Sequence, residues 1–199
     1  MSKPALKQNP YITAEEYLAR ERAADYKSEY FDGEIFAMAG ASEPHNLIVY
    51  NISGEFYTQL KQRPCKAYSS DLRLKVSPSG LYTYPDVVVV CGEAQFEDNE
   101  LDTLLNPTLI VEVLSKSTEG RDRGAKSEHY SKLDSLQEYL LVAPNRPRAE
   151  LFTKEGKGRW LLATFDHLED IVKLASIDCK LVLKDIYAKV DFAAAEARP

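Results

Sequence analysis

The sequence predicts a mixed α/β (α+β) domain in which helices flank a central sheet. Two apolar segments, 87–90 (four consecutive valines) and 109–114, have the composition of buried strands. Amphipathic segments lie before and after this pair, and turns containing Gly or Pro separate shorter strand-like segments. The predicted core is therefore helix, three strands, helix and strand, with one hairpin before it and another after it.

The N-terminal segments carry local signals. Thr13-Ala14-Glu15-Glu16 has the spacing of a capping box and should begin a short helix that ends near Arg22. Asp32-Gly33 is a two-residue turn signal, which predicts a hairpin of residues 26–31 and 34–39.

The core helix is expected to begin after Ser42 and to end near residue 62, because apolar residues recur at helical spacing up to that point. Residues 67–76 and 81–90 flank Pro78-Ser79-Gly80 and should form a further hairpin. Alternation in its first strand predicts a solvated face that carries Asp71, Arg73 and Lys75.

The C-terminal half predicts a helix, a strand and a hairpin. The helix should run from Ser117 or Thr118 to about Leu133, and residues 138–142 have the pattern of a buried strand. Residues 149–153 and 159–164 should pair, and the tail 193–199 is expected to fray.

Length and composition fit one domain over residues 1–199, with its core at about 43–144 and hairpins at 26–39 and 149–164. The net charge of −6 argues against a protein that coats nucleic acid through bulk electrostatics, although a local basic surface remains compatible. No apolar stretch is long enough to span a bilayer, and the N-terminus lacks the apolar region of a signal peptide. The three scattered cysteines are expected to be reduced thiols, so we predict a cytoplasmic protein.

Each apolar strand carries one carboxylate that the strand pattern does not explain. Asp86 opens the valine run, and Glu112 lies in the middle of the second run. Buried carboxylates are usually paired or bind a cation, and neighbouring strands lie about 4.8 Å apart, close enough to share one ion. The pair predicts a site for a hard divalent cation, Mg²⁺ or Mn²⁺. The alternatives are a turn role for Asp86 and a buried ion pair for Glu112.

Lys126 is the third candidate. It shares one predicted helical face with Asp122 and Tyr130, at spacings of four residues, directly after the Glu112 strand. Its ammonium group could reach back to the carboxylates and stabilise a developing negative charge or help position a water. The alternative is a surface Asp–Lys pair.

These residues and their order resemble the Uma2 family, restriction-endonuclease-like proteins of the PD-(D/E)XK nuclease superfamily. The resemblance covers about residues 11–190 and rests on Pro85-Asp86, Val111-Glu112-Val113-Leu114-Ser115, Asp122, Lys126, Tyr130, Glu138-Tyr139 and Pro144. It implies a restriction-endonuclease-like αβββαβ core that acts on DNA. It also implies that Asp86 and Glu112 bind the metal and that Lys126 is the catalytic lysine.

Three positions depart from the pattern that the resemblance implies. Leu114 occupies the usual lysine position, two residues after the glutamate, so the role must have moved to Lys126. Leu140 and Ala143 stand where tryptophan and aspartate are typical, which we interpret as packing variation.

Glu34 and His45 are weaker candidates. Superfamily members often take a further acidic ligand from the N-terminal part of the core, so the resemblance makes Glu34 a candidate metal ligand. The alternative is a solvated hairpin residue. His45, near a helix N-terminus, could orient a water or a phosphate, or could serve as a cap or packing residue.

The predicted activity is Mg²⁺- or Mn²⁺-dependent hydrolysis of DNA phosphodiester bonds by Asp86, Glu112 and Lys126. A homodimer is expected because duplex DNA presents two antiparallel strands. The competing expectation is a nucleic-acid-binding or regulatory module that keeps the fold without cleaving. A metal-dependent hydrolase of a small phosphorylated substrate would also fit the acidic charge.

Overall fold

The computed structural model describes residues 11–115, 119–156 and 158–192. Its helical elements are α1 (Ala14–Ala23), α2 (Glu43–Leu60), α3 (Glu119–Arg121), the π-helical turn η1 (Asp122–Lys126), α4 (Ser127–Tyr130), the 3₁₀ turn η2 (Ala175–Ile177) and α5 (Leu183–Ile186). Its strands are β1 (Ser28–Phe31), β2 (Glu34–Ala37), β3 (Cys65–Ser69), β4 (Arg73–Val76), β5 (Leu81–Thr83), β6 (Val87–Cys91), β7 (Thr103–Leu104), β8 (Leu109–Val113), β9 (Glu138–Val142), β10 (Ala149–Lys154), β11 (Trp160–Phe165), β12 (Ile171–Leu174) and β13 (Cys179–Val182).

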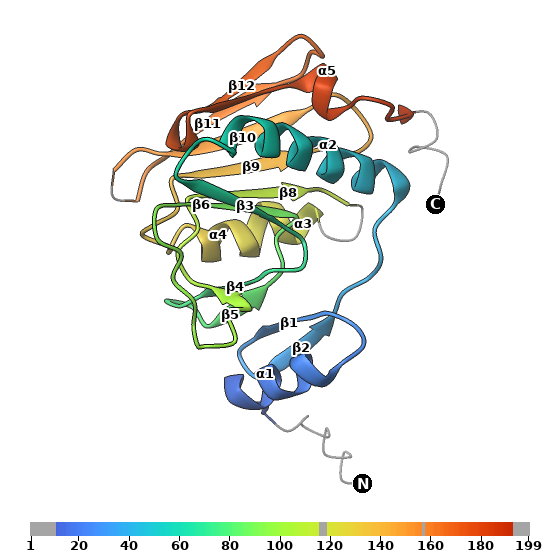
Figure 1. Cartoon of the computed structure of the whole chain (residues 1–199). Coiled ribbons are helices and arrows are strands. Elements are labelled where there is room, and N and C mark those ends of the chain that lie inside the picture. Colours follow the sequence, from blue (N-terminus) through green and yellow to red (C-terminus); the bar gives the residue numbers. More distant parts are fainter. Residues whose placement is uncertain (1–10, 116–118, 157, 193–199) are drawn as a thin grey trace, which may run out of the picture.

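The strands of the described residues form one six-stranded sheet, one five-stranded sheet and a two-stranded ribbon. The six-stranded sheet has the order β11-β10-β9-β8-β6-β3, and it is mixed because β8 and β9 are parallel while their neighbours pair antiparallel. The five-stranded sheet has the order β2-β1-β5-β4-β7, and β12 pairs with β13 in the ribbon. Figure 1 shows α2 across one face of the six-stranded sheet and α4 on the other. The predicted fold class, a mixed sheet flanked by helices, is confirmed.

Two apolar cores lie on the two faces of the six-stranded sheet. On one face, Ile48, Ile52 and Phe56 of α2 are fully buried at helical spacing against the sheet, the ribbon and α5. On the other face, Tyr130 of α4 and Leu74 of β4 belong to a core that joins this sheet to the five-stranded one. The α4 side carries the candidate site, as shown below.

Several local predictions hold. Thr13 and Glu16 form the reciprocal capping box that begins α1, and the hairpins β1–β2 and β10–β11 have the expected pairing. The predicted helix after the Glu112 strand is present from Glu119 to Tyr130, but it contains the π-helical turn η1 and ends three residues before Leu133. Its expected start at Ser117 or Thr118, like the tail 193–199, lies outside the described residues.

The predicted hairpin of residues 67–76 and 81–90 is divided between two sheets. Its outer halves pair as β3 and β6 in the six-stranded sheet, and its inner halves pair as β4 and β5 in the five-stranded one. The prediction of a solvated face was also wrong for Arg73, which is buried. Its guanidinium donates to Tyr84 and Thr103 and pairs with Asp102, so polar partners rather than solvent satisfy the charge.

The expectation of three reduced thiols was wrong. Cys65 and Cys91 form a disulfide, because the pairing of β3 with β6 places these two residues directly opposite each other. Cys179 is free and buried. Within the described ranges, no helix is both long and apolar enough to cross a membrane.

Candidate active site

Asp86 and Glu112 face each other on neighbouring strands. The β6–β8 register pairs Val87 with Val111, so the next position along places Asp86 opposite Glu112. The backbone N–H of Val113 donates to Asp86 Oδ2 at 2.8 Å, which fixes the Asp86 carboxylate beside the end of β8. Glu112 is 4% exposed. The strand pairing thus brings together the two carboxylates that the sequence singled out.

Lys126 points into a group of acidic side chains, as its spacing predicted. We call this group, which consists of Glu29, Asp86, Glu112 and Asp122, the carboxylate cluster. Its ammonium lies 3.1 Å from Glu112 Oε1, 3.1 Å from Glu29 Oε1 and 3.4 Å from Asp122 Oδ1. Tyr130, four residues further along this face, donates its hydroxyl to Glu112 Oε1 at 2.7 Å. The open alternative of a surface Asp–Lys pair is excluded, because the Lys126 side chain is only 7% exposed.

Burial and charge determine how these groups titrate. Burial raises the pKa of Glu112 to about 7, with Asp86 and Asp122 adding to the shift and Lys126 opposing it. Burial alone would lower the pKa of Lys126, but the surrounding carboxylates outweigh it and raise the pKa well above its ordinary value. Lys126 therefore remains a cation at neutral pH and is suited to electrostatic stabilisation rather than to proton abstraction.

His45, at the start of α2, lies beside Asp86. Its Nε2 is 3.2 Å from Asp86 Oδ2, and its side chain is 13% exposed. Burial lowers the pKa of His45, but the hydrogen bond to Asp86 and the nearby negative charges raise it more, so its net shift is upward. The structure thus assigns His45 to the site as a partner of Asp86.

Glu29 of β1 is a member of the cluster that sequence reasoning missed. It is 4% exposed, accepts a hydrogen bond from Thr83, and pairs with Lys126 through one oxygen and with Arg121 through the other. The N-terminal acidic candidate, Glu34, belongs to the same hairpin but is an exposed residue across the turn from Phe31. The structure does not bring Glu34 into the cluster.

The three positions that depart from the family pattern are all buried. Leu114 follows β8 and packs in the core on the α4 side of the sheet, at 3% exposure. Leu140 and Ala143 are also buried, which agrees with their interpretation as packing positions. The Lys126 ammonium, 3.1 Å from Glu112 Oε1, supplies the positive charge that Leu114 cannot.

The donor set fits a hard divalent cation that retains water. In the part of the chain that the structure describes, Asp86 Oδ1 and Glu112 Oε2 take part in no hydrogen bond or ion pair. No group of three or more His, Cys, Asp or Glu side chains among these residues is arranged to hold a metal. Mg²⁺ commonly binds through one or two carboxylates and completes its shell with water and substrate oxygens, so two facing carboxylates suffice.

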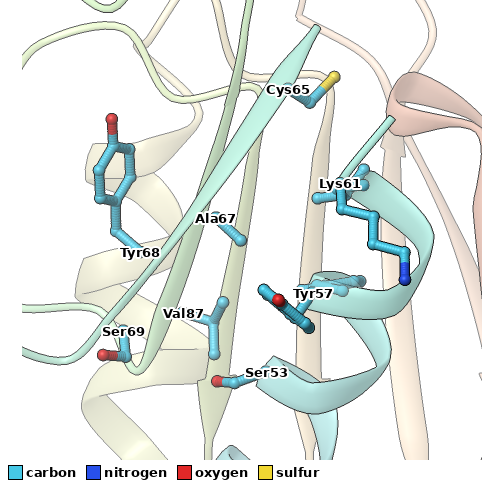
Figure 2. Close-up of a pocket in the computed structure, with 10 residues that line it drawn as sticks. Ser53, Tyr57, Lys61, Cys65, Ala67, Tyr68, Ser69 and Val87 are labelled. Carbon is cyan, nitrogen blue, oxygen red and sulfur yellow. The ribbon is translucent and has the colours of Figure 1, made fainter. Parts of the chain in front are cut away.

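A cleft with a volume of about 280 Å³ lies elsewhere, between α2 and β3. Figure 2 shows Ser53 and Tyr57 of α2 on one side of it and Ala67 and Val87 on the other. None of the three predicted catalytic residues lines this cleft. We place the candidate active site at the carboxylate cluster, where the ionisable chemistry is concentrated.

Comparisons with known proteins bear on the family and on the fold. The model of the Uma2 family, described as "Putative restriction endonuclease", matches residues 14–183. Two uncharacterized proteins of Synechocystis sp. are similar. The protein sll1609 is 42% identical over 76% of this chain and 85% of its own length, and slr1290 is 37% identical over 92% and 95%.

A crystal structure from Anabaena variabilis, titled a "putative nuclease belonging to DUF820", has the same fold. It superposes with a TM-score of 0.70 at 20% identity and covers 89% of this chain and 98% of its own. At this identity the likeness concerns the fold. The family match spans most of the sequence, including Asp86, Glu112 and Lys126, and the chain therefore belongs to the Uma2 family.

Proposed function

We propose that this protein is a metal-dependent endonuclease that hydrolyses phosphodiester bonds of DNA. The observation that carries the proposal is the opposition of Asp86 and Glu112 on adjacent strands, with the Lys126 ammonium 3.1 Å from Glu112. Two carboxylates with unengaged oxygens beside a fixed cation suit the hydrolysis of a phosphate ester. The family description as a restriction endonuclease supports this choice.

Asp86 and Glu112 would hold Mg²⁺ or Mn²⁺, which when bound neutralises charge on a phosphate and lowers the pKa of water. The Val113 N–H orients Asp86, and the Tyr130 hydroxyl orients Glu112. Lys126 contributes a permanent positive charge that stabilises the charge developing on the phosphate.

The proposal includes a homodimer. Duplex DNA has two antiparallel strands, and a symmetric dimer presents one site to each. The acidic net charge of −6 means that DNA must be held by local cations rather than by the overall field.

The test is a cleavage assay on supercoiled, linear and single-stranded DNA of varied sequence, with Mg²⁺, Mn²⁺ or EDTA. The unmodified protein should nick or cut in a metal-dependent manner. Asp86→Asn retains an oxygen that can accept from Val113, yet it should lose at least a hundredfold in rate because a metal ligand loses its charge. Lys126→Ala should show a similar loss.

Glu34→Gln is the matched control. It removes an acidic side chain of the β1–β2 hairpin, to which Glu29 also belongs, but Glu34 is exposed and lies outside the cluster. It should cleave like the unmodified protein. Circular dichroism and melting curves confirm that each variant is folded. The proposal is wrong if the unmodified protein shows no metal-dependent cleavage, or if Asp86→Asn cleaves at the full rate.

A non-cleaving nucleic-acid-binding module is the second candidate. It is favoured by the contacts of Lys126, whose ammonium is already engaged by three carboxylates. Such a module would bind DNA in the same assay without changing its length or topology.

A further inference from the structure

Arg121 is the cation that connects the buried cluster to solvent. Its Nη1 pairs with Glu29 Oε2, while Lys126 pairs with the other oxygen of the same carboxylate. The side chain of Arg121 is 35% exposed, whereas that of Lys126 is 7% exposed. The two cations therefore flank Glu29, one inside the cluster and one at its solvent side.

An exposed aromatic ring supports Arg121 from the β1–β2 hairpin. The guanidinium lies 5.1 Å from the centre of the Phe36 ring, and Phe36 is 38% exposed. A cation–π contact of this kind positions the guanidinium plane without using its N–H donors. The contact with Glu29 involves Nη1, so other N–H groups of Arg121 can face a ligand.

We infer that Arg121 binds a backbone phosphate of the DNA substrate beside the phosphate that is cleaved; this inference rests on the proposed function. Four carboxyl groups (Glu29, Asp86, Glu112 and Asp122) gather here, and they would repel an incoming polyanion. A guanidinium matches two phosphate oxygens with parallel N–H donors, which an ammonium cannot do. Arg121 is thus suited to bring the DNA backbone to the edge of an otherwise acidic site.

The competing explanation is that Arg121 only neutralises Glu29. The two explanations predict different DNA affinities when the charge of Glu29 is removed together with that of Arg121. If Arg121 acts solely through Glu29, replacing both residues by neutral ones restores DNA affinity. If Arg121 contacts a phosphate, the double replacement does not restore it, because the contact itself is gone.

The experiment measures DNA affinity in an Asp86→Asn background, by fluorescence anisotropy of a labelled duplex in EDTA. The salt concentration is varied between about 50 and 200 mM, a range over which affinity that depends on phosphate contacts falls strongly. Arg121→Ala should weaken binding by about tenfold and reduce the slope of log affinity against log salt by about 0.9, the value for one lost phosphate contact. Arg121→Ala with Glu29→Gln should give the same reduced slope. Phe36→Leu should weaken binding by only about threefold and leave the slope unchanged, since the charge remains.

Arg63→Ala is the matched control. The side chain of Arg63 is also 35% exposed and also pairs with a carboxylate, that of Asp178, but Arg63 follows the end of α2 that is far from His45. Fifteen residues of helix separate His45 from Leu60, a distance of roughly 22 Å, so Arg63 lies far from the cluster. Its replacement should leave affinity and slope unchanged.

The outcomes separate the two proposals. A slope unchanged by Arg121→Ala, or restored by the added Glu29→Gln, overturns the phosphate contact and leaves the nuclease proposal standing. No DNA binding by the Asp86→Asn parent, together with no cleavage by the unmodified protein, overturns both.

Discussion

Glu112 shows how the site acts against stability at the scale of one residue. It is buried among acids, and its pKa is raised to about 7 chiefly by burial. Glu112→Gln keeps an oxygen for Tyr130 and Lys126 but removes the charge. We predict that, at pH 8 without metal, the free energy of unfolding of this variant exceeds that of the unmodified protein by about 2 kcal/mol. Metal-dependent cleavage should be lost.

The same residue gives a pH dependence of definite sign. The pKa of Glu112 is about 7 in the folded protein against 4.5 in the reference state, so the folded protein binds more protons between these values. The stabilising contribution of protonated Glu112 is fully present below about pH 4.5 and is lost as the pH rises through about 7. Urea unfolding in EDTA from pH 5 to 8 should show this fall in the unmodified protein and in Glu34→Gln, but a shallower one in Glu112→Gln. Equal slopes in all three would contradict the assignment.

The sequence predicted that the three candidate residues Asp86, Glu112 and Lys126 lie together, because strand patterns and the order of motifs along the chain indicate it. Asp86 and Glu112 interrupt apolar strands, and Lys126 follows at a helical spacing, so these three could be found. Glu29 could not, because nothing local distinguishes it from Glu34 in the same hairpin. Only the packing of β1 beside η1 decides which of the two acids reaches Lys126. The burial of Arg73 was not predicted for the same reason. Another element covers this residue, and such burial does not appear in the hydrophobic pattern of its own strand.

At the scale of the element, β6 carries the candidate site before its first residue and a disulfide at its last. Asp86 and Cys91 are five residues apart along this extended segment, or roughly 16 Å. The disulfide joins residues 26 apart in sequence, which by chain entropy stabilises the fold by about 3.5 kcal/mol. We predict that Cys65→Ala with Cys91→Ala lowers the unfolding free energy by that amount and leaves metal binding and cleavage intact.

Dithiothreitol supplies the control for this prediction. It should lower the melting temperature of the unmodified protein and leave that of the double variant unchanged, because Cys179 forms no disulfide. A loss of cleavage in the folded double variant would show instead that the site depends on this end of β6.

The helix of Lys126 shows what periodicity leaves out. The spacing of Asp122, Lys126 and Tyr130 predicted one face of an α-helix, and all three do belong to the cluster or its hydrogen bonds. The structure nevertheless winds residues 122–126 as a π-helical turn. Such turns are common at functional sites, and they depend on tertiary contacts, for example the hydrogen bond from the Tyr139 hydroxyl to the Asp122 carbonyl.

At the scale of the whole molecule, the sequence predicted the order of the core but not its division into sheets. The long hairpin appeared continuous, yet β3 and β6 join one sheet while β4 and β5 join another. The division occurs around Pro85, where the chain passes from β5 to β6, and it places Asp86 directly before the N-terminal end of β6, an interior strand of the six-stranded sheet. The strands β7, β12 and β13 were not predicted, because each has four residues or fewer and is too short to show a period.

Charge balance over the folded molecule gives the last prediction. Among the described residues, the carboxyl groups of Glu29, Asp86, Glu112 and Asp122 outnumber the fixed cations of the cluster, Lys126 and Arg121, so a divalent ion would reduce the excess negative charge. An ion that binds only the folded state stabilises it by about 2.7 kcal/mol at a hundred times its dissociation constant. For a domain of this size that is a rise of roughly 5–10 °C in melting temperature.

Differential scanning calorimetry at pH 8 should show this rise with Mg²⁺ or Mn²⁺ in the unmodified protein and in Glu34→Gln. The rise should be absent in Asp86→Asn and in Glu112→Gln, because each removes the charge of one proposed ligand while keeping an oxygen in place. An equal rise in all four proteins would place the ion elsewhere on the acidic surface. A rise lost only in Glu34→Gln would move the metal site to the β1–β2 hairpin.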